Sequence, residues 1–140
     1  MLKARLRTHK TVGSAFTLIE LMIVVVIVAI LATAAIPLYT GLTRDAEWAE
    51  AIAGAGQIHS ACRTRIGRAG DLTGVSDYTD VGVETTDLDG KYFENDDYDL
   101  TVDDADEGEY TITVTHPDDA TQTYIIDETG TESGTYTTGG

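Results

Sequence analysis

The residue with the clearest chemical consequence is Glu20, an acid near the start of a long apolar run. The run extends over residues 17–39 and, apart from Glu20, holds apolar residues, a few threonines and Pro37. A carboxylate inside a membrane segment costs about 2.5–3.5 kcal/mol at the bilayer centre and less near its edge. An acid at this position therefore needs a partner.

The other polar residues do not have the spacing of a metal-binding or catalytic site. Neither His59 nor His116 has a cysteine or histidine at metal-ligand spacing, and the sequence shows no recognisable pair of a catalytic nucleophile and its base. Residues 87–90 alternate oxygens as a calcium loop does, yet Tyr98 stands where an EF-hand has its glutamate. We predict no enzyme, no catalytic or metal-binding residue and no cofactor, and leave calcium binding open to titration.

The apolar run is long enough to cross a bilayer. As a helix, residues 17–39 span about 35 Å at 1.5 Å per residue. Four bases precede the run and no acid lies among them, so we expect the N-terminus to stay in the cytoplasm and the body to face outward. These bases are Lys3, Arg5, Arg7 and Lys10.

Two processing sites compete on either side of this run. A cut between Ala15 and Phe16 leaves the apolar run in the mature protein. An ordinary secretory cut after Ala34, at the A-x-A pattern of residues 32–34, releases a soluble acidic domain. The second cut leaves Glu20 inside the hydrophobic region of an unusually long leader, so we favour the first.

Beyond Pro37 the apolar residues form a stripe with three- and four-residue spacings, which predicts one helix over residues 16–67. The stripe comprises Trp48, Ile52, Ala55, Ile58 or His59, Cys62 and Ile66. Pro37 removes one helical hydrogen bond and should kink the helix. Cys62, the one cysteine, cannot form an internal disulfide, and we expect a buried, unreactive thiol.

The rest of the chain predicts a loop over residues 68–90 and then an antiparallel sheet. The expected strands cover residues 98–102, 109–115 and 121–126, with a short fourth at 91–93. Tyr110, Ile112 and Val114 share the strand face that should meet the helix. The tail over residues 129–140 should be loose or only partly paired. The fold class is therefore α+β, with one long N-terminal helix on a small antiparallel sheet.

The body of the protein is strongly acidic. Of 24 acids none lies in residues 1–15, and beyond that segment only five bases oppose them. A surface of this sign should repel nucleic acid and anionic lipid headgroups, both of which are bound through cationic contacts. The scarcity of lysine is consistent either with adaptation to high salt, where self-repulsion is screened, or with a merely acidic solvated surface.

The segment Phe16-Thr-Leu-Ile-Glu20, preceded by a basic leader and the small residue Ala15, resembles the start of mature type IV pilins and pseudopilins. The family has glycine where Ala15 stands, and many members have a C-terminal disulfide loop that this chain lacks. The resemblance implies four parts: a removed leader (1–15), a transmembrane and filament-core half-helix (16–39), an amphipathic half-helix (40–67), and a loop-plus-sheet head (68–140).

The resemblance also implies roles for individual residues. Prepilin peptidase would cut between Ala15 and Phe16, and Phe16 would be N-methylated. Glu20 would pair with the freed amine of a neighbouring subunit during assembly, and Pro37 would kink the helix. The implied partners are further copies of the chain in a helical filament, the peptidase and an inner-membrane assembly platform.

The resemblance implies a pilus subunit, held in the inner membrane before assembly and extracellular afterwards. Adhesion, twitching motility, biofilm formation and DNA uptake are the processes it would serve. The alternatives are a pseudopilin of type II secretion and, from another class, the secreted soluble domain released after Ala34.

Overall fold

A computed structural model describes residues 16–137. The predicted leader, including Ala15, lies outside these residues. The chain divides between Pro37 and Leu38 into two units, which we describe separately. The helix α1 (Leu18–Ala69) contributes to both: its first part forms the N-terminal unit, and the remainder belongs to the head, residues 38–140.

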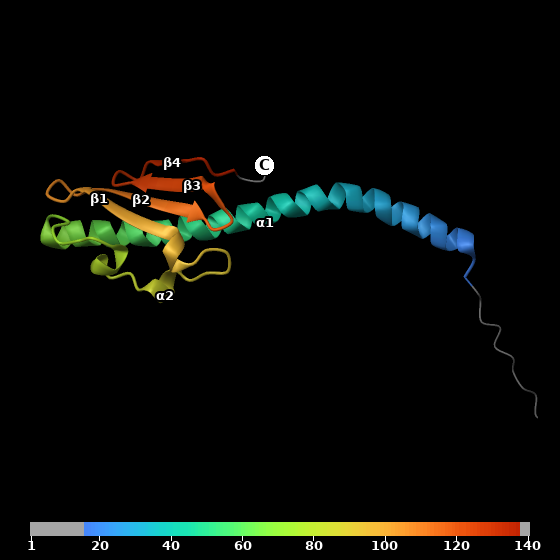
Figure 1. Ribbon diagram of the computed structural model, residues 1–140, viewed down its shortest axis with the longest axis horizontal. Helices are drawn as coiled ribbons and strands as arrows, with labels where there is room; N and C mark the ends of the chain where they lie inside the picture. Colours follow the sequence, from blue (N-terminus) through green and yellow to red (C-terminus); the bar gives the residue numbers. More distant parts are fainter. Residues whose placement is uncertain (1–15, 138–140) are drawn as a thin grey trace, which may run out of the picture. The chain divides into compact units, whose positions relative to one another are not determined.

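The head contains a four-stranded antiparallel sheet in the order β1-β2-β3-β4 (Figure 1). The strands are β1 (Tyr98–Asp104), β2 (Glu109–His116), β3 (Asp119–Asp127) and β4 (Glu132–Gly134). Successive strands pair through short turns, as hairpins do. The predicted α+β class and meander are confirmed.

The core forms where the sheet meets one stripe of α1. The helix contributes buried side chains at three- and four-residue steps: Trp48, Ala51, Ala55, Ile58 and Cys62. The central strand β2 contributes Tyr110, Ile112 and Val114, as predicted, and none of these side chains is measurably exposed. Fully burying an aliphatic side chain contributes roughly 1.5–3 kcal/mol, so residues such as Ile58, Ile112 and Val114 each add substantially to the stability of the head.

The buried face of α1 differs from the predicted stripe. It includes Ala51, whereas Ile52 and Ile66 are only partly buried against the core. The two alanines, Ala51 and Ala55, are the smallest side chains on this face of α1. Their size allows a close approach of the large aromatic residues that fill the rest of the core.

The prediction of a short strand at residues 91–93 is wrong. This segment is irregular, and the fourth strand is instead β4, in the tail that we expected to be loose or only partly paired. The Tyr92 and Phe93 N–H groups donate to Glu50 Oε1 of α1, at 2.8 and 2.9 Å. These backbone donors are therefore satisfied by a helix side chain rather than by a neighbouring strand.

The segment between α1 and β1 is more ordered than the predicted loop. It holds η1 (Tyr78–Val81), α2 (Thr85–Leu88) and η2 (Asn95–Asp97). In each turn an acid accepts from the N–H of the residue three positions earlier. The three pairs are Asp77 N to Asp80 Oδ2, Glu84 N to Asp87 Oδ2, and Glu94 N to Asp97 Oδ2.

Glu50 holds the segment between α1 and β1 against the helix by accepting hydrogen bonds from its backbone. Its partial burial raises its pKa, but hydrogen bonds from the Phe93, Tyr92 and Lys91 backbone outweigh that effect and leave the pKa below 4.5. Gly90 lies against the same carboxylate, and a Cβ at this position would collide with it. The close approach explains why residue 90 is a glycine.

We predict that Glu50→Ala lowers the free energy of unfolding by about 1–3 kcal/mol, because two backbone donors lose their acceptor. Denaturation of the full chain in detergent, followed by the fluorescence of the single Trp48, measures the change. The control is Glu107→Ala, which removes an exposed acid and should alter stability by less than about 0.5 kcal/mol. Equal effects of the two substitutions would contradict the fastening role.

Candidate functional site

The first turn of α1 closes on itself through Thr17 and Glu20. The Thr17 N–H and hydroxyl donate to Glu20 Oε2, at 3.1 and 2.9 Å. In return, the Glu20 N–H donates to Thr17 Oγ1 at 3.3 Å. The Thr17 carbonyl accepts from Leu21 N, so Thr17 is the N-cap and the arrangement is a capping box.

This capping box gives Glu20 a partner within its own subunit. A helix start leaves four N–H groups without intrahelical acceptors, and a carboxylate there also interacts favourably with the helix dipole. The bonded groups are exposed, so the carboxylate remains accessible to another molecule. Thr17 was not among the predicted site residues, although a threonine followed three residues later by glutamate before an apolar run is the recognised signature.

The apolar half of α1 has no protein around it in the described chain. Its large apolar side chains, from Phe16 to Leu42, are all more than half exposed. An 18-residue window of α1 has a mean hydropathy of 2.9, and by length and composition this helix could cross a membrane. A contiguous apolar surface of this size normally marks a contact with lipid or with other protein.

The remaining predicted assembly residues are placed as follows. Phe16 is 78% exposed and directly precedes the capping box, whereas Ala15 lies outside the described residues. Pro37 lies inside α1, and the helix continues on both sides of it. Cleavage, methylation and the kink remain predictions.

Cys62 occupies the core, where its side chain is fully buried. Burial raises the pKa of the Cys62 thiol to about 11. The thiolate, which is the reactive form, is therefore scarce at neutral pH. This agrees with the predicted unreactive thiol.

The two histidines of the head make structural contacts. His59 Nδ1 lies 2.9 Å from the Tyr110 hydroxyl, and His116 Nε2 lies 3.7 Å from Glu47 Oε2. Within residues 16–137 no cluster of three or more His, Cys, Asp or Glu side chains is arranged to hold a metal ion. Asp89, a member of the calcium-like segment, accepts a hydrogen bond from Asn95 N at 3.2 Å.

The capping box leads to a prediction for Thr17. Thr17→Ala removes the hydroxyl and should destabilise the first turn of α1 by about 0.5–2 kcal/mol. Hydrogen exchange of the full chain in detergent micelles should show faster exchange at the amides of residues 18–21, with Thr33→Ala as the control. Unchanged exchange at these amides would show that the capping box does not hold the turn.

His59 leads to a prediction for pH. Burial, followed by the nearby charge of Arg63, lowers its pKa below the usual 6.5, although Asp127 opposes the shift. The unfolded chain therefore binds more protons than the folded chain between the two pKa values, and stability is lost as the pH falls through that window.

We expect His59→Gln to lose less stability between pH 7 and pH 5 than the unchanged protein, since glutamine does not titrate but can still bond to Tyr110. Thermal melts at the two pH values measure the difference. Identical losses in the two proteins would rule out His59 as a source of the pH dependence.

Comparison with protein families matches residues 14–36 to the prokaryotic N-terminal methylation motif. A search of curated proteins and a search of solved structures returned no match. The matched residues include the capping box and most of the exposed apolar helix. The motif is typical of the structural proteins of type IV pili and of pseudopilins, and no enzymatic family is indicated. The chain thus carries an N-terminal methylation motif typical of type IV pilins and pseudopilins, ahead of a pilin-like α+β fold.

Proposed function

We propose that the chain is a structural subunit of a type IV pilus. Prepilin peptidase would cut between Ala15 and Phe16, and the new N-terminus would be methylated. The observation that carries this proposal is a single acid, Glu20, in the first turn of α1, whose part before Pro37 is otherwise apolar and exposed. The methylation motif over residues 14–36 supports it.

The exposed apolar helix suggests where the subunit resides before and after assembly. In the inner membrane its side chains would be covered by lipid, which is as apolar as another helix, so packing rather than burial would drive contacts there. Outside the lipid the same surface would be buried against other copies in the filament core, at roughly 25 cal/mol for each Å² removed from water. An inner-membrane platform would carry out the transfer.

Glu20 would exchange one partner for another during assembly. In the single subunit it accepts from Thr17, and in the filament it would accept from the Phe16 amine of a neighbouring copy. A buried ion pair adds little net stability, but leaving one partner alone costs about 3–5 kcal/mol. The pair would therefore fix the axial register, and a subunit that keeps its leader has no such amine to offer.

The acidic head would face outward from such a filament. Direct binding of nucleic acid by the head is not expected, because phosphate contacts are made by Lys and Arg. Adhesion, motility and DNA uptake are all compatible with an acidic filament surface.

Two alternatives have specific support. A type II secretion pseudopilin would carry the same matched motif. A secreted soluble domain is favoured by the unit boundary after Pro37, since a cut after Ala34 would leave the head intact. Detection of extracellular filaments would distinguish a pilus subunit from a pseudopilin. The measured mass of the mature chain would distinguish both of these from the secreted domain.

Intact mass spectrometry of material sheared from cells tests the proposal. We expect a polymer whose subunit begins at Phe16 and carries one additional methyl group. A correctly processed Glu20→Ala variant should yield at least about tenfold fewer filaments, because the Phe16 amine would lose its carboxylate. The control is Glu107→Ala, an exposed head acid, which should assemble normally. A mature chain starting near residue 35, or normal filaments from Glu20→Ala, would contradict the proposal.

A further inference from the structure

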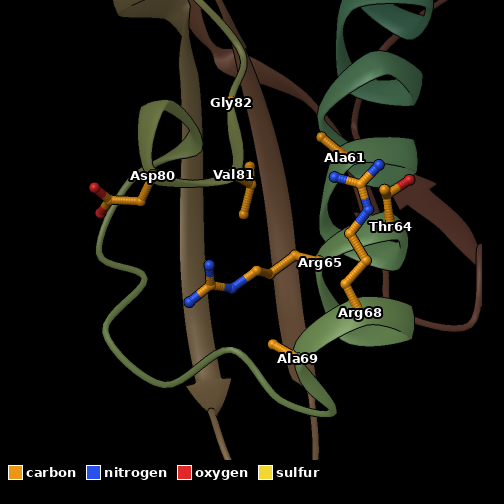
Figure 2. Close-up of a pocket in the computed structure, with 8 residues that line it drawn as sticks. All are labelled: Ala61, Thr64, Arg65, Arg68, Ala69, Asp80, Val81 and Gly82. Carbon is orange, nitrogen blue, oxygen red and sulfur yellow. The ribbon is translucent and has the colours of Figure 1, made fainter.

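A pocket of about 300 Å³ opens between the last turns of α1 and the η1 turn of the head (Figure 2). Its helix side is built by residues at positions i, i+3, i+4 and i+7, which share one helical face. They are Ala61, Thr64, Arg65 and Arg68. The other side is formed by η1 and the residue after it, Asp80, Val81 and Gly82.

Two guanidinium groups in this pocket make no hydrogen bond within residues 16–137. Arg65 reaches from the helix toward the η1 side, and Arg68 runs back along the helix beside Thr64 (Figure 2). The Arg65 Nε atom is buried and has no hydrogen-bond partner among residues 16–137. Buried donors without a partner are rare in proteins, and a bound ion or water is one of the explanations for them.

The acid that lines this pocket, Asp80, already accepts hydrogen bonds from other residues. Asp80 Oδ2 accepts from the Ser76 N–H, the Ser76 hydroxyl and the Asp77 N–H, at 2.9, 3.0 and 3.2 Å. These bonds, first those of Ser76, lower the pKa of Asp80, and Arg65 adds only a further small attraction. The pocket is therefore left with an excess of positive charge.

An excess of positive charge is exceptional in this protein. Three of the five bases beyond residue 15 lie within the six residues from Arg63 to Arg68. The charge of Arg63 adds to the lowering of the His59 pKa by burial and opposes the rise that burial causes in the pKa of Tyr110, and Arg63 lines a different pocket. Arg65 and Arg68 therefore form a separate pair. Such a pair suits a carboxylate, which two guanidinium groups can bind in a planar, charge-assisted arrangement.

Unpartnered acids lie at the opposite end of the head. The β2–β3 turn lies beside α1 (Figure 1). At this turn the His116 ring centroid lies 5.6 Å from that of Trp48. In this turn Asp118 is exposed, and no described residue donates to its carboxylate. Seventeen helical residues separate Trp48 from Arg65, a length of about 25 Å. Asp118 therefore cannot reach the arginines of its own chain.

We propose that the pocket of Arg65 and Arg68 binds the Asp118 carboxylate of a second copy of this chain. The inference rests on the proposed filament, in which all helices run in parallel. Head-to-tail packing of identical copies places unlike ends of neighbouring heads together. The basic end of one head then meets the acidic turn of the next, and the carboxylate supplies the acceptor that Arg65 and Arg68 lack.

Cross-linking within filaments tests this contact directly. The full chain carrying both Arg68→Cys and Asp118→Cys should yield a ladder of covalent multimers when assembled filaments are treated with a short bis-maleimide linker, since an arginine–carboxylate contact holds the Cα atoms farther apart than the roughly 7 Å limit of a disulfide. Cys62 provides a silent background, because it is buried and its thiol pKa is about 11. The controls are each single cysteine variant and the pair Arg63→Cys with Asp118→Cys, which should remain mostly monomeric.

Charge reversal supplies a second readout. Arg68→Asp and Asp118→Arg should each reduce the filaments sheared from cells about tenfold, because like charges then face each other. Combining them should restore most of the yield, whereas combining Arg68→Asp with Asp106→Arg should not. Fluorescence melts of Trp48 confirm that each variant folds.

The outcomes separate this inference from the proposed function. If the unchanged protein forms no filaments, the proposed function fails. If it forms filaments that give no Arg68–Asp118 cross-link and tolerate both reversals, the inference alone is overturned. Stabilisation of monomers by inorganic phosphate, lost in Arg68→Asp but kept in Asp118→Arg, would assign the pocket to a free anion and overturn it as well.

Discussion

One continuous helix has to satisfy two different surroundings, and the rest of the structure depends on this constraint. Before Pro37, α1 is apolar on all sides and its side chains are exposed. From Trp48 onward one stripe of α1 is apolar, and most of that stripe is buried against the sheet. The change from an all-round pattern to a striped one therefore divides the chain into a part that requires an external partner and a part that folds on itself.

The head is organised to a large extent by carboxylates that accept from backbone N–H groups. Glu50 ties the segment before β1 to the helix, and acids cap each of the three short turns that follow. Asp127 acts in the same way in the turn between β3 and β4, where it accepts from Thr129 and Thr131. Many acids of this lysine-poor protein thus have short-range structural roles that do not require a basic partner.

The elements that sequence reasoning predicted correctly are those with a strong local period. The stripe from Trp48 to Cys62 and the alternating strand from Glu109 to His116 depend on residues close together in sequence. The capping box of Thr17 and Glu20 was equally local and could have been predicted, but only Glu20 was singled out.

The errors arose where a contact spans a long stretch of sequence. Residues 91–93 have β-forming side chains, but Glu50, about forty residues earlier, takes their N–H groups. The short strand β4 has no hydrophobic pattern and is fixed by pairing with β3. The pocket of Arg65 and Arg68 likewise depends on how η1 folds back toward the helix, which no local pattern encodes.

The balance of acids and bases also bears on how whole fibres would behave toward one another. Each head exposes many carboxylates and few bases, so parallel fibres carry like charge along their entire length. At low ionic strength such fibres would stay apart in solution. Above about 0.1–0.2 M salt, where the screening length is 10 Å or less, or with divalent cations bridging the surfaces, they could gather into bundles.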